Sequence, residues 1–171
     1  MGDLFNFING KAFKSEDWDT CGLPIIRIQN LTSDREYNYY NGYIEDKYKI
    51  HHNDIIFSWS GTIDTFVWTG GDAVLNQHLF KVIAKNIDKT FGLYLLQSCM
   101  EGLQELSHGA VMKHLKKGDV DNFQVQIPTS ISEQQSIANL FQTYDSLADS
   151  IQKSIDTLEK EKNSIMQKIF A

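Results

Sequence analysis

The sequence contains few of the residues that interrupt helices or build cross-linked scaffolds. Among its 171 residues there are two prolines and two cysteines. Cys21 and Cys99 lie far apart, with no C-x-x-C pair and no histidine at ligand spacing, so neither a disulfide framework nor a structural zinc site is expected. This cysteine usage is typical of a reducing compartment, and we expect both thiols to lie in the core.

Long apolar runs are also missing. No stretch reaches the roughly 18 residues that a membrane-spanning helix requires. The N-terminus lacks the basic and then apolar order of a secretion signal. We therefore expect a cytoplasmic protein. Apolar residues still make up 42% of the sequence, which is enough for one compact domain with an appended segment.

Signatures of catalysis are absent or weak. Pro24 and Pro128 fit no Asn/Asp-Pro-Pro-aromatic motif of a methyltransferase, and neither a phosphate loop nor a G-x-S-x-G turn occurs. The five histidines show no paired spacing for metal ligation. We expect no catalytic residue, metal or cofactor. Glu45-Asp46-Lys47 matches half of a nuclease motif by a pattern that often arises by chance, and a small metal-dependent nuclease using Glu45 and Lys47 stays as an alternative.

Positive charge is in deficit. The chain has 16 Lys and Arg against 22 Asp and Glu, which gives a net charge of −6. A free-standing nucleic-acid binder usually has the opposite balance. The one tight basic cluster contains Lys113, His114, Lys116 and Lys117, so any strong DNA contact needs either this cluster or help from a partner.

The dominant feature that is present is a helical pattern at the C-terminal end. From Ser132 to Phe170 apolar residues recur at steps of three and four without Pro or Gly, and Ser132-x-x-Gln135 is typical of a capping box at a helix start. A helix of this length spans about 55 Å, more than the preceding domain can cover, so its apolar stripe favours a partner helix. We call the stripe the helix seam; its residues are Leu147, Ile151, Ile155, Leu158, Ile165 and Ile169. A four-residue step after Ile151 and the position of Lys162 interrupt its heptad repeat.

The first 130 residues predict a mixed α/β domain, so the expected fold class is α+β with one long C-terminal coiled-coil helix. The tyrosine-rich segment 33–48 is expected to be a loop-rich insertion, and Trp59-Ser60-Gly61-Thr62 a tight turn. Asp88 should cap a helix that ends near Ser107. Strands are expected over Phe5–Ile8, before a turn at Asn9-Gly10, and over Leu23–Gln29, Asp54–Ser58, His78–Ala84 and Phe123–Ile127. A hairpin of Thr65–Thr69 and Ala73–Leu75 is expected around Gly70-Gly71.

Several short motifs follow one another in a characteristic order: Leu23-Pro24-Ile25-Ile26-Arg27-Ile28, Asp54-Ile55-Ile56-Phe57-Ser58 with Ser60-Gly61-Thr62, Leu75-Asn76-Gln77-His78, and Ile127-Pro128 before Glu133-Gln134. With this set the chain resembles, from residue 3 to its end, the specificity subunits of type I restriction-modification systems. The resemblance implies that residues 1–130 are a target-recognition domain and 131–171 a spacer helix. Members usually carry two of each in one chain, so this chain resembles a half-length subunit.

The resemblance further implies a non-catalytic subunit that recognises one half of a bipartite target in double-stranded DNA. Its partners would be methyltransferase subunits, with restriction subunits as further candidates, and a second copy bound through the helix. Asn76, Gln77 and His78 match a family motif but are equally suited to structural hydrogen bonds. A coiled-coil interaction module without a DNA role is the other alternative. The candidate DNA-binding residues, chosen for their side-chain chemistry, are Tyr37, Asn38, Tyr40, Ser60, Thr62, His108, Lys113 and His114.

Overall fold

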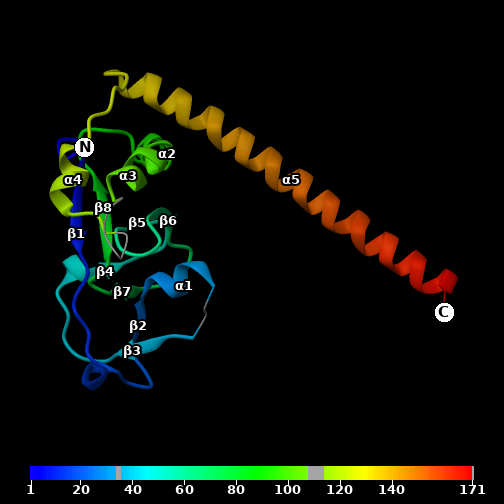
Figure 1. Ribbon diagram of the computed structural model, residues 1–171, viewed down its shortest axis with the longest axis horizontal. Helices are drawn as coiled ribbons and strands as arrows, with labels where there is room; N and C mark the ends of the chain where they lie inside the picture. The colour runs from blue at the N-terminus through cyan, green and yellow to red at the C-terminus, as the bar shows by residue number, and fades with distance from the viewer. Residues whose placement is uncertain (34–35, 108–113, 171) are drawn as a thin grey trace. The chain divides into compact units, whose positions relative to one another are not determined.

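The computed structural model describes residues 1–33, 36–107 and 114–170 (Figure 1). It divides into two compact units, Met1–Pro128 and Thr129–Ala171. The first unit contains two small β-sheets with short helices, and the second contains one long helix, which is the α+β organisation that the sequence predicts. The short helices are α1 (Ile28–Thr32), α2 (Lys89–Ser98), α3 (Met100–Leu106) and α4 (Lys117–Asn122), with 3-10 turns η1 (Ser15–Asp17) and η2 (Asp46–Tyr48).

The first sheet is fully antiparallel and has the strand order β1-β8-β5-β6. Its strands are β1 (Phe5–Asn9), β5 (Ile55–Ser58), β6 (Asp64–Val67) and β8 (Leu79–Ala84). Phe7 packs its ring against both Phe57 and Phe80, with ring centroids 5.9 and 5.8 Å apart. Phe57 and Phe80 are paired in register on neighbouring strands, so the three rings form one aromatic cluster in the core.

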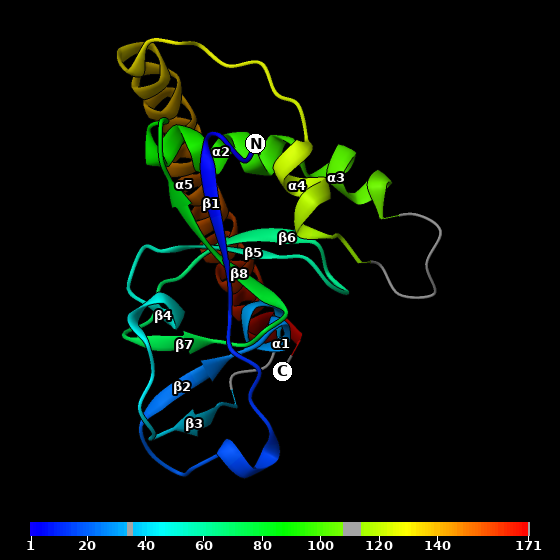
Figure 2. The same cartoon turned by 90° about the vertical axis from the view of Figure 1, so that its left-hand side faces the viewer.

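The second sheet is mixed and has the order β3-β2-β7-β4. Strand β2 runs parallel to β7, whereas β3 and β4 pair antiparallel with their neighbours. In Figure 2 its strands lie below β5 and β6 of the first sheet. The strands are β2 (Leu23–Ile26), β3 (Asn38–Tyr40), β4 (Lys49–Ile50) and β7 (Ala73–Leu75).

The isoleucine run of β2 is buried on both faces of this sheet. Ile26 belongs to a cluster with Leu75 of its own sheet and Ile56 of the other sheet, whereas Ile25 packs with Phe13 and Val74 in a second cluster. Successive side chains of a strand point to opposite faces, so adjacent isoleucines supply both clusters. Each fully buried isoleucine contributes about 1.5–3 kcal/mol of hydrophobic stabilisation.

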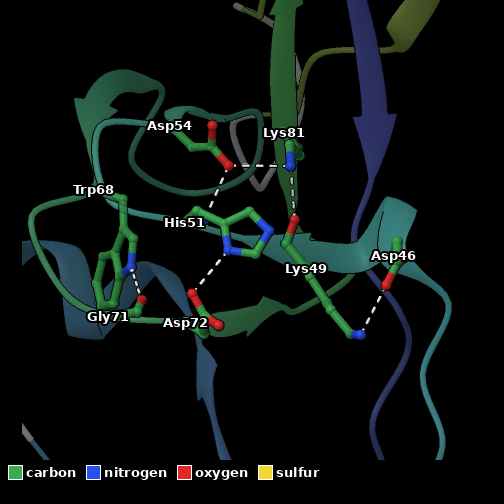
Figure 3. A network of polar contacts seen from close by, with 8 residues as sticks. All are labelled: Asp46, Lys49, His51, Asp54, Trp68, Gly71, Asp72 and Lys81. Atoms are coloured by element: carbon green, nitrogen blue, oxygen red, sulfur yellow. Dashed lines mark hydrogen bonds and ion pairs between the residues drawn. The ribbon is translucent and has the colours of Figure 1, made fainter.

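A partly buried charged side chain joins the two sheets (Figure 3). Lys81 of β8 forms an ion pair with Asp54, with Nζ 3.0 Å from Oδ2, and donates a 2.8 Å hydrogen bond to the carbonyl oxygen of Lys49 in β4. The same Asp54 oxygen accepts a hydrogen bond from the backbone N–H of His51 at 2.9 Å. The Lys81 ammonium is therefore compensated by acceptors from two chain segments.

The hairpin predicted around Gly70-Gly71 is wrong. Strand β6 pairs with β5 in the first sheet, and β7 pairs with β2 and β4 in the second. The connection between them carries Trp68, which is buried in the cluster of Ile26 and Ile56 and donates its indole N–H to the Gly71 carbonyl oxygen at 2.6 Å. Burying this large ring directs the chain from one sheet to the other.

Four further local predictions need correction. The strand from Leu23 ends at Ile26, because the Asn30 side chain accepts a hydrogen bond from Arg27 N and starts α1. The segment 33–48 includes the short strand β3.

The helix after Asp88 is capped as expected, by hydrogen bonds from Thr90 N and Phe91 N to the Asp88 side chain. It divides into α2 and α3 at Cys99, whose N–H is shared between the Leu95 and Leu96 carbonyls. Residues 123–127 form no strand; the preceding residues instead form α4, which buries Val120.

The cysteine prediction is correct only in part. Both thiols are free, and Cys99 is partly buried, but Cys21 is exposed. Cys21 lies just after residues 15–20, a surface segment in which the Asp19 carboxylate accepts hydrogen bonds from the Thr20 N–H and hydroxyl. This segment supplies no apolar surroundings in which the thiol could be buried.

The second unit contains α5 (Ile131–Phe170), an uninterrupted helix of 40 residues. It confirms the predicted long helix, although the capping residue is Ser130 and not Ser132. The Ser130 hydroxyl accepts a hydrogen bond from Glu133 N at 3.4 Å, and its carbonyl accepts the first helical bond from Gln134 N. Ser132 already lies inside the helix, where its carbonyl accepts from the Ser136 hydroxyl. Within the described residues no helix is long and apolar enough to cross a membrane.

Candidate functional site

One group of predicted site residues lies on the turn that joins β5 to β6. Gly61 takes a φ of +70°, a conformation that glycine adopts without strain, and the turn presents Thr62 to solvent. Ser60 forms an isolated β-bridge with His114, and the neighbouring Leu115 N–H donates to the Trp59 carbonyl at 2.9 Å. The structure thus brings Ser60 and His114 together although they are distant in sequence.

Trp59 organises the side chains at this turn. His114 meets its indole edge-on, with ring centroids 4.5 Å apart and an interplanar angle of 85°. On other sides Trp59 packs against Phe80 at 5.7 Å and His78 at 5.6 Å. The exposed imidazole of His114 is therefore oriented by a fixed aromatic surface.

The turn of Asn76, Gln77 and His78 connects this group to the second sheet. Asn76 is buried, and its N–H donates to the Ile26 carbonyl at 2.9 Å, so its role is structural. Gln77 and His78 contact each other through their Nε2 atoms at 3.4 Å. Among the described residues, Trp59 Nε1, Gln77 Oε1 and His78 Nδ1 are buried without a hydrogen-bond partner. A buried polar atom without a hydrogen-bond partner destabilises the fold, and these three atoms belong to side chains that contact one another. We therefore include this turn in the candidate site.

A second group surrounds β3, but two of its predicted members have packing roles. The ring of Tyr37 packs against the cluster between the sheets. The Tyr40 ring lies edge-on to Phe13 at 5.1 Å, and its hydroxyl accepts from Lys11 Nζ at 3.0 Å and donates to the Tyr43 carbonyl at 3.1 Å. Both tyrosines are consequently occupied by contacts within the domain.

Asn38, the third member of the β3 group, is bound to an arginine. Its Oδ1 accepts a hydrogen bond from Arg27 Nη1 at 2.6 Å, and the Arg27 guanidinium lies over the Trp18 ring at 4.7 Å from Cζ to centroid. Trp18 remains 45% exposed. A planar cation held between an aromatic face and an amide can bind paired hydrogen-bond acceptors such as those of guanine or phosphate.

The sequence alone predicted some, but not all, of the residues in these two groups. His108 and Lys113 lie outside the described residues. Trp59, Trp18 and Arg27 were missed as site residues, since nothing local distinguishes a site tryptophan from a core one. The only available signal was the rarity of arginine, which occurs twice in the chain, at positions 27 and 35.

The residues of the alternative nuclease motif are paired with their own neighbours. Lys47 Nζ lies 2.7 Å from Glu45 Oε2, and this hydrogen bond raises the pKa of Lys47. Likewise the hydrogen bond from Lys49, 2.7 Å from Asp46 Oδ1, lowers the pKa of that carboxyl. No three His, Cys, Asp or Glu side chains gather as potential metal ligands within residues 1–33, 36–107 and 114–170.

Comparison with solved structures defines the class of fold. A chain from a structural study of complex assembly and conformational transition of the type I R-M system matches with a TM-score of 0.74 at 16% identity, over 94% of this chain and 40% of that one. The HsdS subunit from Thermoanaerobacter tengcongensis matches with a TM-score of 0.65 at 17% identity, over 90% and 38% of the two chains. The protein has the fold of type I specificity subunits.

The chain belongs to the family of type I restriction modification DNA specificity domains, whose model matches residues 1–160. Among curated relatives, the type I restriction enzyme EcoBI specificity subunit of Escherichia coli is 25% identical over 175 aligned positions, which cover the whole of this chain and 37% of the relative. The chain therefore spans little more than a third of that subunit. Membership of the family confirms the resemblance drawn from the sequence motifs.

Proposed function

We propose that this chain is a non-catalytic, sequence-specific DNA-recognition subunit that acts in the cytoplasm with methyltransferase subunits. The family match carries this proposal, because it covers the recognition domain and most of the long helix in one continuous stretch. The DNA-reading domain would comprise residues 1–130 and the spacer and dimerisation helix residues 131–171. Restriction subunits are further candidate partners.

We assign direct base contacts to the turns of the domain. Thr62 and His114 are exposed, and Trp59 orients His114. Ser60 is buried, at 8% exposure, and would position His114 through the β-bridge. Hydroxyl and imidazole groups can each donate to and accept from base edges in the major groove. Tyr37 and Tyr40 belong to the separate group around β3, where they would stabilise the domain through their packing contacts. His108 and Lys113 remain predicted contacts on chemical grounds alone.

The net negative charge of the chain is consistent with a complex in which the methyltransferase contacts the phosphates and this chain contacts the bases. Phosphate contacts supply most of the affinity for DNA and carry no sequence information, whereas base contacts supply specificity. A methyltransferase partner can provide the cations that a chain with net charge −6 lacks. The chain alone should therefore bind DNA weakly, and the complex should bind it tightly.

The helix seam supports pairing with a second copy of α5. Its residues are exposed, with Ile155 at 43%, Leu158 at 64% and Ile169 at 66% of their full accessible area. Residues 131–150 carry three acidic residues and no Lys or Arg, whereas residues 151–170 carry four lysines against three acids, so the halves have net charges of −3 and +1. Antiparallel pairing places these complementary halves together, and parallel pairing does not.

The test is co-expression of the chain with its methyltransferase, followed by sequencing of methylated positions in the host genome. We expect methylation at one defined sequence, and neither methylation nor cleavage by the chain alone. Thr62→Ala should change the methylated sequence or its occupancy without changing the thermal midpoint. Thr69→Ala, an equivalent exposed threonine on a different loop, is the matched control. Stable α5 pairing with no sequence-specific methylation would refute DNA recognition and favour the plain interaction module.

A further inference from the structure

Arg27 is held in one orientation before any ligand arrives. Its guanidinium lies over the Trp18 ring at 4.7 Å, and its Nη1 donates to Asn38 Oδ1 at 2.6 Å. Its backbone is fixed as well, because Arg27 N donates to Asn30 Oδ1 at 2.9 Å where α1 starts. A side chain that is already ordered loses less conformational entropy when it binds.

The positive charge of Arg27 is held by neutral partners. Among the described residues no carboxylate forms an ion pair with it, although Trp18 stands between Asp17 and Asp19 in sequence. Asp17 instead accepts from Lys14 N at 2.8 Å, and Asp19 from Thr20 N at 2.6 Å. A guanidinium has five N–H donors, and the bond to Asn38 uses one of them. The site thus combines a rigid planar cation with donors that remain for a ligand.

A continuous series of contacts connects Arg27 to the turn of Trp59. The residue before it, Ile26, accepts the backbone hydrogen bond from Asn76. Asn76 begins the turn that ends in His78, and the His78 ring packs against Trp59 at 5.6 Å. The same Trp59 orients His114. Arg27 is therefore linked through one short turn to the candidate base-reading residues.

We propose that Arg27 is a further DNA-contacting residue, which binds two hydrogen-bond acceptors of the target through its planar fork. Trp18 and Asn38 are positioning residues that orient it. This inference rests on the proposed function. Two acceptor pairs of DNA match the fork, namely guanine O6 and N7 in the major groove and the oxygens of a backbone phosphate.

The experiment uses the complex of the full chain with its methyltransferase and selects bound duplexes from a library of randomised DNA. Arg27→Lys keeps the charge but loses the fork. We expect it to weaken binding to the selected target by on the order of tenfold to a hundredfold. Trp18→Ala should produce a smaller loss, and Trp18→Phe should restore most of it by keeping an aromatic face. Lys14→Gln removes an exposed cation from the same surface segment and is the matched control.

The selected sequences distinguish the two acceptor pairs. If Arg27 contacts guanine, the Arg27→Lys complex loses preference for one G·C pair and keeps its salt dependence. If it contacts phosphate, the Arg27→Gln complex binds all duplexes more weakly, and the slope of affinity against salt falls by about one counterion. Both results support the inference.

Equal affinity, equal sequence preference and an equal salt slope for wild type, Arg27→Lys and Arg27→Gln would overturn it, provided that circular dichroism shows all three chains folded. The proposed function would survive that result, because the wild-type complex would still select one sequence. Failure of the wild-type complex to select any sequence would instead refute the proposed function itself. Loss of folding in Arg27→Gln is separated from loss of contact by circular dichroism and by the Arg27→Lys variant, which keeps a cationic hydrogen-bond donor at this position.

Discussion

Partly buried polar side chains link the two sheets of the first unit, and Lys81 is an example. Its side chain is 15% exposed, and that of its ion-pair partner Asp54 is 21% exposed. Lys81→Met would keep the aliphatic stem but leave Asp54 and the Lys49 carbonyl without this partner. We expect a loss of about 2–3 kcal/mol in the free energy of unfolding, measured by urea denaturation.

Lys14→Met, which breaks an exposed ion pair with Glu16, is the control and should leave the unfolding midpoint unchanged. Equal midpoints for wild type and Lys81→Met would mean that the Lys81 ion pair adds nothing measurable to the stability of the two sheets.

The two cysteines differ in environment, and this difference predicts their reactivity. Cys21 is exposed, whereas burial raises the pKa of the Cys99 thiol and reduces its thiolate fraction at neutral pH. A thiol-reactive dye should label Cys21 quickly and Cys99 slowly in the folded chain. Cys21→Ser should abolish the fast phase, and addition of denaturant should make both sites fast. A fast phase that persists in Cys21→Ser would contradict the burial of Cys99.

At the scale of elements, the chain is bonded to both sheets where it leaves β1, to β8 of the first sheet and to β7 of the second. Gly10 N donates to the Leu79 carbonyl, and Lys11 N to the Leu75 carbonyl, both at 2.9 Å. A Cβ on Gly10 would overlap the backbone oxygens of Leu75 and Asn76. Backbone atoms cannot move aside as the end of a flexible side chain can.

Gly10→Ala should therefore destabilise the chain by about 2–4 kcal/mol, measured as the shift in free energy of unfolding. Gly71→Ala is the matched control, since a Cβ there meets no atom within 4 Å. Similar stability of the two variants would show that β1 and β7 can separate at little cost.

At the scale of the whole molecule, the exposed helix seam predicts a dimer. Ile155→Asp combined with Leu158→Asp places charges in the seam and should yield monomers in light scattering at tens of micromolar. The control exchanges the charges of two residues on the outer side of the heptad, Asp156→Lys with Lys160→Asp, which keeps the net charge of this half of the helix and should leave the dimer intact. A wild-type chain that is monomeric under these conditions would exclude self-pairing.

The same pairing predicts the form of the DNA target. Two identical chains related by a two-fold axis present the same reading surface in opposite orientations, so the target should be an inverted repeat with an unread spacer. A helix of 40 residues is about 60 Å long and acts as a ruler against base pairs spaced about 3.4 Å apart. Deleting one heptad of α5 should shorten the spacer and preserve the half-sites in methylation sequencing. Two half-sites of different sequence would point to a second, different recognition domain.

The sequence by itself determined the features that depend on local pattern. An apolar repeat without Pro or Gly specified the long helix, because each of its residues finds its hydrogen-bond partner four positions away. The β-branched run before Ser58 specified β5, and Asp88 specified the start of α2. The ordered motifs of the recognition domain were sufficient to indicate the family.

Tertiary structure decided whatever depends on partners distant in the chain. Phe5 pairs with Ala84, and β2 with β7, across separations that no local pattern encodes. The burial of Trp68 sends β6 and β7 into different sheets, and the burial of Tyr37 makes it a packing residue. The surroundings of Arg27 likewise exist only in the fold, because Trp18 and Asn38 come from separate segments of the chain. The orientation of the guanidinium depends on these two contacts and could not be predicted from the sequence.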